Sequence, residues 1–151
     1  MKLRIMAFVA IALAVAAESR PAQARPQSDF GLGIILGRPS GVTMEFGLAA
    51  NQSIDLAIGI DTFRGDHFYV HGNYLFYLSP VIQGQADLSP YLGAGIFFSG
   101  GPRGGIRAPF GFSLDFQAAP LKLFIEVAPH LRLVDEVDLD FGVAGGFRYF
   151  F

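Results

Sequence analysis

The sequence predicts an all-β fold, namely a closed antiparallel eight-stranded up-and-down transmembrane β-barrel that is preceded by a cleaved signal peptide. Three observations predict it. About eight segments alternate between apolar residues and small or polar ones, as two-faced strands do. Turn-forming residues separate these segments. The chain is rich in Phe and Gly and has a positive mean hydropathy, yet no apolar run after residue 24 reaches the length of a membrane helix.

Residues 1–24 have the order of a secretory signal peptide. Lys2 and Arg4 make a basic start, Ile5–Ala17 is apolar and rich in Ala, and Ala22-Gln23-Ala24 has the small-residue pattern of a cleavage site. The apolar run is shorter than the roughly 20 residues of a membrane-spanning helix. We therefore expect cleavage after Ala24 and one barrel domain over residues 25–151.

The first half of this domain predicts four strands. Glycines oppose the apolar residues of the first strand, and the tight turn Gly37-Arg38-Pro39-Ser40-Gly41 follows it. Asn51-Gln52 and Arg64-Gly65-Asp66 mark the next two turns. The predicted strands are Phe30–Leu36, Val42–Leu48, Ile54–Thr62 and His67–Leu78.

The second half predicts four more strands after a longer connection, Ser79–Ser89. A Gly-rich loop, Ser99–Gly105, separates the first two of them. Pro109 is expected to mark a bulge, because proline cannot donate a hydrogen bond to a strand ladder. The predicted strands are Pro90–Phe98, Ile106–Gln117, Leu121–Leu133 and Asp138–Phe151. The last of these alternates almost without a break.

Volume decides which face of these strands points outward. The apolar face carries several large side chains per strand, whereas the opposite face is crowded with Gly, Ala, Ser and Thr. The interior of an eight-stranded barrel is only wide enough for side chains to fill it. The bulky apolar face must therefore point outward, where lipid rather than water is its suitable surrounding.

Ionisable side chains on the polar strand faces are then expected inside the barrel. Buried charges are tolerated when they are paired and hydrogen-bonded, so we predict a salt-bridge network that plugs the lumen. Its predicted members are Glu45, Asp55, His71, Arg107, Asp115, Lys122, Glu126, His130, Arg132 and Arg148.

Composition and motifs predict neither a catalytic residue nor a cofactor. The chain has no Cys, and its formal net charge of −2 comes without a basic patch for nucleic acid. His67, His71 and His130 are too scattered for a metal site. Asp66, His67 and Ser99 lie near one predicted rim, but polar loop residues are ordinarily only solvated.

The leading functional hypothesis is an outer-membrane protein with a plugged polar lumen and a structural or surface-interaction role. Three alternatives remain open: a narrow channel, a lipid A-modifying outer-membrane enzyme, and a soluble periplasmic lipid-binding calyx. The expected location is the bacterial outer membrane, and the expected state is a monomer surrounded by outer-membrane lipids and lipopolysaccharide.

Two stretches resemble known outer-membrane barrels. Residues 31–43, with Gly37-Arg38-Pro39-Ser40-Gly41, resemble the G-x-P-[ST]-G first hairpin of a family of small eight-stranded barrels of the OmpA/OmpX-like kind, which have no assigned activity. Tyr74-Leu75-Phe76 and residues 124–129 look like that family too. An aromatic last strand ending in Phe is similar to the assembly signal of such barrels. That resemblance implies recognition of Phe147, Tyr149 and Phe151 by the barrel-assembly machinery, with periplasmic chaperones acting earlier.

Overall fold

The computed structural model describes residues 29–62, 65 and 67–151, and these residues form an all-β, antiparallel structure. The predicted signal peptide, residues 1–24, lies outside the described residues. The strands are β1 (Phe30–Gly37), β2 (Ser40–Ala49), β3 (Gln52–Asp61), β4 (His67–Tyr77), β5 (Ala86–Ser99), β6 (Arg103–Arg107), β7 (Phe110–Phe116), β8 (Leu121–Arg132) and β9 (Asp138–Phe150). None of the described residues forms a helix that is long and apolar enough to cross a membrane.

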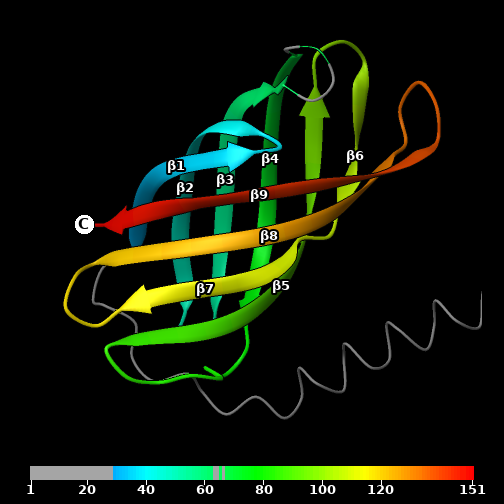
Figure 1. Ribbon diagram of the computed structural model, residues 1–151. Coiled ribbons are helices and arrows are strands. Elements are labelled where there is room, and N and C mark those ends of the chain that lie inside the picture. Colours follow the sequence, from blue (N-terminus) through cyan, green and yellow to red (C-terminus); the bar gives the residue numbers. More distant parts are fainter. Residues whose placement is uncertain (1–28, 63–64, 66) are drawn as a thin grey trace, which may run out of the picture.

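The strands hydrogen-bond in a ring (Figure 1). Strands that follow one another in the sequence pair, except that β6 and β7 do not pair with each other, and β1 also pairs with β9 from Gly31 opposite Phe150 to Gly37 opposite Ala144. β6 and β7 share one place in the ring, because both pair with β5 on one side and with β8 on the other. The described strands therefore make a ring of eight, and the strand number agrees with the prediction.

The predicted bulge at Pro109 is wrong. A bulge adds one residue to one strand of a pair. Here two residues, Ala108 and Pro109, separate Arg107 from Phe110, and two residues also separate their partners His130 and Val127 on β8. The register is thus unbroken. The ladder is interrupted only locally, because Pro109 has no N–H, although its carbonyl still accepts a hydrogen bond from the Gly93 amide at 2.7 Å.

β2 and β3 begin two residues earlier than predicted, and β5 and β6 begin earlier still. β5 starts at Ala86, inside the predicted connection, and runs beside β7 as far as Phe116. β6 starts at Arg103, inside the predicted Gly-rich loop, where Arg103 pairs with Ser99. In both places the neighbouring strand supplies backbone partners, and these outweigh the low strand propensity of Asp87 in β5 and of Gly104 and Gly105 in β6.

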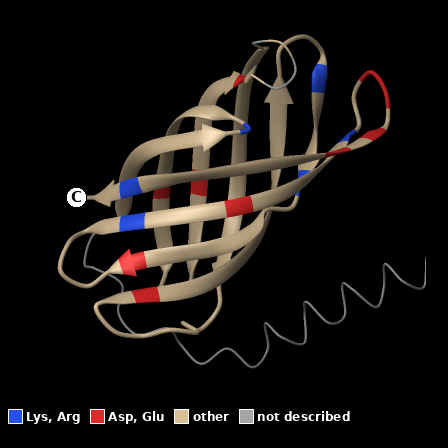
Figure 2. Cartoon of the chain, in the orientation of Figure 1, with Lys and Arg blue, Asp and Glu red and all other residues tan. Residues whose placement is uncertain are grey.

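The side chains divide between the two faces as the volume argument predicts. Phe110, Phe112 and Ile125 are exposed on the outside of the ring, whereas Glu126 and Arg148 are buried inside it. The same division of side chains continues around the ring. Figure 2 shows that charged residues are few along the strands and that acidic residues gather on the loop between β8 and β9. Within the described strands, most charged side chains thus face the interior and most large apolar side chains face outward.

The seam between β1 and β9 depends on a glycine. A Cβ atom at Gly33 would lie 1.7 Å from the carbonyl oxygen of Phe147, on the paired strand. No side chain can occupy that space without separating the two backbones. Gly84, in the connection between β4 and β5, has nothing within 4 Å of such a Cβ.

We expect Gly33→Ala to destabilise the protein by about 1–3 kcal/mol, the usual cost of forcing atoms into a packed site. The measurement is the urea midpoint, followed by far-UV circular dichroism because the chain has no Trp. Gly84→Ala is the control and should leave the midpoint nearly unchanged. Equal midpoints for the two variants would contradict the close approach at the seam.

Candidate functional site

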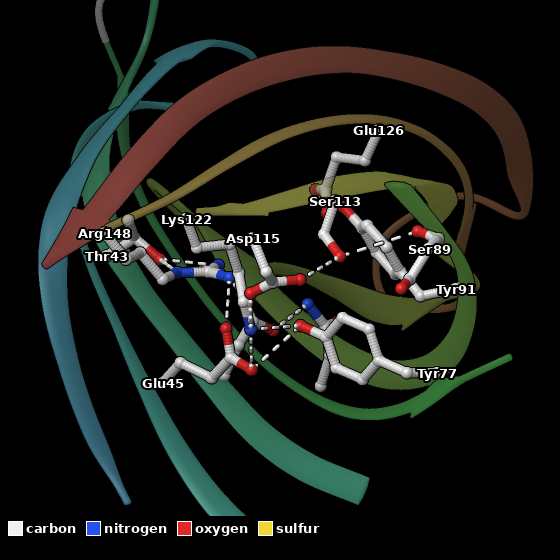
Figure 3. Close-up of polar contacts among 12 residues, drawn as sticks. Thr43, Glu45, Tyr77, Ser89, Tyr91, Ser113, Asp115, Lys122, Glu126 and Arg148 are labelled. Atoms are coloured by element: carbon white, nitrogen blue, oxygen red, sulfur yellow. Dashed lines mark hydrogen bonds and ion pairs between the residues drawn. The ribbon is translucent and has the colours of Figure 1, made fainter. Parts of the chain in front are cut away.

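A continuous series of charged and polar side chains lies inside the ring, and Figure 3 shows the part of it around Glu45, Lys122 and Arg148. Each member contacts the next one through an ion pair or a hydrogen bond. We call this series the interior network. In order of contact its members are Glu126, Arg107, His71, Asp55, Arg148, Glu45, Lys122 and Asp115.

Arg148 on β9 is the centre of the interior network. Its Nη1 donates to Glu45 Oε2 at 2.8 Å, and its Nη2 donates to Asp55 Oδ2 at 2.8 Å. Nε and Nη2 also donate to the Thr43 hydroxyl, at 3.1 and 2.9 Å. The guanidinium carbon lies 4.1 Å from the centre of the Phe124 ring, a cation–π arrangement. One planar side chain thereby joins β9 to β2 and β3 across the seam.

Lys122 on β8 continues the network toward the end of the ring that holds the C-terminus. Its Nζ lies 2.8 Å from Glu45 Oε1 and 3.7 Å from Asp115 Oδ1. The Tyr77 hydroxyl donates to the same Glu45 oxygen at 2.8 Å. Nζ also lies 4.8 Å from the centre of the Phe150 ring. Aromatic rings thus cover the ammonium group where the network approaches this opening.

Arg107 on β6 forms the other branch. Its Nη2 donates to Glu126 Oε1 at 2.6 Å, and the Tyr91 hydroxyl donates to the second oxygen of that carboxylate at 3.1 Å. Nη1 contacts His71 Nδ1. Because a guanidinium can only donate, Nδ1 accepts, and the ring proton sits on Nε2, which faces Asp55 Oδ2 at 3.6 Å. His71 therefore links the two branches as a neutral ring.

Charge inside the ring is balanced. Within the interior network three cations, Arg107, Lys122 and Arg148, are at most 2% exposed, and so are three anions, which are Glu45, Asp55 and Glu126. Asp61 is equally buried but pairs with Arg38, outside the network. A buried charge without a partner costs several kcal/mol, whereas a balanced and hydrogen-bonded set avoids most of that penalty. The charged groups of the interior network are therefore closely paired with one another.

A separate polar group lies at the opposite end of the ring. Arg38, in the turn between β1 and β2, bonds through Nε to Asp61 at 2.8 Å and through Nη1 to Asp140 at 2.5 Å. Burial lowers the pKa of Arg38, but the hydrogen bonds to Asp61 and Asp140 outweigh it, so this pKa lies above its usual value. Beneath Arg38, the Tyr69 hydroxyl and His130 Nε2 are 2.7 Å apart.

The structure places eight of the ten predicted lumen residues at 4% exposure or less. The other two lie toward the openings. Asp115 still reaches Lys122, but Arg132 pairs with Asp138 at 3.2 Å rather than with the interior network. His130 also stays apart from the network's charges and bonds to Tyr69 instead.

Several interior partners were missing from the predicted set although they lie on the predicted polar faces. They are uncharged, and a search for charges passes over them. The signal that identifies them is the alternation itself, since Tyr69, Asn73 and Tyr77 share a face of β4 with His71. Arg38 was missing too, because a turn residue has no strand parity to place it.

The remaining predicted residues lie on the outside of the ring or at its rim. Phe147, Tyr149 and Phe151 are exposed, and the rings of Tyr149 and Phe151 meet edge to face at 5.1 Å. Asp66 lies outside the described residues, and the described His67 and Ser99 form no hydrogen bond with each other. No group of His, Asp or Glu within residues 29–62, 65 and 67–151 is arranged to hold a metal ion.

No protein-family model matches the chain, and neither a curated protein nor a solved structure matches it. The family resemblance of the first hairpin therefore gains no support from these comparisons. The all-antiparallel ring of eight and its polar interior are the findings on which a function can be argued.

We expect Arg148→Met to lower the free energy of unfolding by about 3–5 kcal/mol, because it leaves Glu45 and Asp55 buried without their shared cation. Urea unfolding followed by circular dichroism measures this loss. Adding Asp55→Asn to Arg148→Met should recover part of the lost free energy of unfolding, since one buried carboxylate that has lost its cation is then removed.

The matched control is Arg132→Met, which removes an arginine whose partner Asp138 is 48% exposed. Its expected cost is below about 1 kcal/mol, as for other solvent-screened pairs. Equal costs at positions 148 and 132 would contradict the central role of Arg148.

Proposed function

We propose that the protein is an outer-membrane β-barrel with a plugged polar lumen, and that its role is structural or one of surface interaction. The observation that carries this proposal is the inverted polarity of the ring. Arg148, Lys122 and Glu126 are buried, while Ile125, Phe112 and Val143 are exposed. A water-soluble domain of this size buries such apolar residues and exposes its charges.

The outward side chains support a lipid-facing surface. Exposed Leu, Ile, Val and Phe occur on every strand of the ring, and their patch is continuous from strand to strand. Contiguous exposed apolar patches on soluble monomers rarely exceed a few hundred Å². The apolar band of a membrane barrel, in contrast, is about 25 Å tall and surrounds the whole molecule.

Strand length and aromatic placement agree with this proposal. A membrane-crossing strand needs about 9–11 residues, and β2, β3 and β4 have 10, 10 and 11. The rings of Phe30, Phe46 and Phe151 adjoin at the C-terminal end, with centroids 5.1 and 6.2 Å from that of Phe30. Barrels carry such aromatic girdles at the membrane interfaces. We place the C-terminal end toward the periplasm and the Arg38 end outside.

The same features bear on the alternatives. Closely paired interior charges favour a plug over a narrow conduit. Tyr69, Phe97 and Phe124 fill interior positions that a lipid-binding calyx would leave open. A lipid A-modifying enzyme needs a nucleophile within reach of a base, and the described His67 and Ser99 share no hydrogen bond. Outer-membrane lipids are the proposed surroundings of a monomer, and the barrel-assembly machinery, after periplasmic chaperones, is its proposed partner during assembly.

We expect Ile125→Arg to separate a membrane location from a soluble one. Ile125 is 58% exposed and lies mid-strand on β8. An arginine at the bilayer midplane costs about 2–4 kcal/mol, whereas an exposed position of a soluble protein changes by about 0.5 kcal/mol or less. The measurement is the stability of the protein refolded into lipid vesicles.

Val137→Arg is the matched control, because Val137 is 77% exposed but lies on the loop between β8 and β9, beyond the proposed band. It should cost almost nothing. A cost near zero at both positions would contradict the membrane proposal. Fractionation gives an independent check, with the protein expected in salt-washed membranes and faster on gels before heating than after.

Planar-bilayer recording tests the plugged interior. We expect no steady openings from the purified protein, because the interior network closes the ring. Arg148→Met breaks that network and should raise the conductance. Discrete, steady openings of the unaltered protein would support the channel alternative instead.

A further inference from the structure

A small cavity opens at the Arg38 end of the ring, apart from the interior network. Its volume is about 20 Å³, which is room for a water molecule or a small polar group. Six strands and the β1–β2 turn contribute to its walls. The lining residues are Arg38, Asp61, Tyr69, Phe97, Ser99, Arg103, His130, Arg132 and Asp140.

Hydrogen-bond donors outnumber acceptors around this cavity. Each guanidinium has five N–H groups and no acceptor. Arg38 uses its donors on Asp61, Asp140 and the Phe141 carbonyl. Arg132 is only 15% exposed and forms one ion pair, with a carboxylate that is about half exposed. The two carboxylates that line the cavity, Asp61 and Asp140, are those that Arg38 bonds, and Arg103 and Arg132 line the same space.

Arg103 and Arg132 are close neighbours on the cavity wall. Arg132 pairs across the strands with Gly105, and Arg103 lies two residues from Gly105 on the same face of β6. Diagonal neighbours of this kind have Cβ atoms roughly 7–8 Å apart, within reach of long side chains. The two guanidinium groups can therefore approach each other, and an anion placed between them would offset the repulsion of their like charges.

The floor of the cavity adds a polar atom without a partner. The ring of Tyr69 stacks on Phe97 with centroids 5.8 Å apart, and His130 meets Phe97 edge to face at 4.9 Å. His130 is 4% exposed, and its Nδ1 has no hydrogen-bond partner among the described residues. Aromatic packing fixes this imidazole on the wall of the cavity that Arg103 and Arg132 also line.

We propose that this cavity binds an oxyanion, a carboxylate or phosphate group, between Arg103 and Arg132. A planar guanidinium matches both groups through paired N–H···O bonds. The group enters from the Arg38 end, and the paired Asp61, Asp140 and Arg38 form the rim beside it. Only the source of the group depends on the proposed membrane location, since outer-leaflet lipids would present phosphates at this end.

The test uses the full protein in detergent micelles with inorganic phosphate and, separately, acetate as probes. Arginine Nε–H signals in ¹H–¹⁵N spectra report the site directly, and Arg103→Lys and Arg132→Lys spectra assign them. We expect the signals of both arginines to shift with saturation. Arg103→Gln and Arg132→Gln should each weaken binding at least about tenfold, because a charge-assisted hydrogen bond is lost.

Two comparisons keep the result decisive. Glu136→Gln, on the loop outside the cavity, changes charge at the same end and should leave the affinity unchanged or slightly higher. Arg103→Lys keeps the positive charge but lacks the paired N–H donors of a guanidinium. It should therefore bind the anion more weakly than the unaltered protein but more tightly than Arg103→Gln. A linear, unsaturated response, or equal affinities for Arg103→Gln and Glu136→Gln, would overturn the site.

The final arm identifies the source of the oxyanion. Purified lipopolysaccharide should displace bound acetate if its phosphates occupy the cavity, and dephosphorylated lipopolysaccharide should not. Displacement by inorganic phosphate alone assigns the site to a free anion. These titrations are made in micelles, so their outcome is independent of the Ile125→Arg result on membrane location.

Discussion

The narrow interior of a ring of eight strands is the constraint on which the rest of the structure depends. Such a ring holds side chains but little else, so every interior group must find its partner among the few others that fit there. Arg148 meets this constraint by serving Glu45 and Asp55 at once. The result is a cross-linked centre in which strands distant in sequence share one set of charges.

The same constraint determines the surface. Once small and polar side chains occupy the interior, the large apolar ones have only the outside left, as Phe110 and Val143 illustrate. A polar centre and an apolar exterior are thus two results of one packing problem. The proposed membrane location follows from this exterior, whereas the proposed oxyanion site follows from the one end where cations are incompletely paired.

Much of the fold was accessible from the sequence because alternation reports strand parity directly. This alternation predicted the number of strands, and it predicted that Glu126 and Arg148 face the interior of the ring. It did not reveal which acid meets which base, because partner choice depends on register and on how far each side chain reaches across the ring. Turn signals were weaker guides. Ser89 and Gly104 fall in a predicted connection and a predicted loop, yet both lie in paired strands, since a neighbouring strand supplies their backbone contacts.

Arg38 and the tyrosines show what remained out of reach. Arg38 belongs to a turn, so only the three-dimensional path of that turn brings it to Asp61 and Asp140. Tyr77 and Tyr91 are uncharged but donate to Glu45 and Glu126, and such support becomes visible only when the hydrogen bonds are known.

The pairing of β1 with β9 also has a kinetic consequence. Gly31 lies opposite Phe150, so the last ladder to form joins residues that are almost the whole described chain apart. Hairpins between consecutive strands lose little entropy on loop closure and can form early. The pairing of β1 with β9 forms later, because it requires two segments that are distant in sequence to meet. Refolding should therefore pass through an open curved sheet with two unsatisfied edges, the species most prone to edge-to-edge association with other copies.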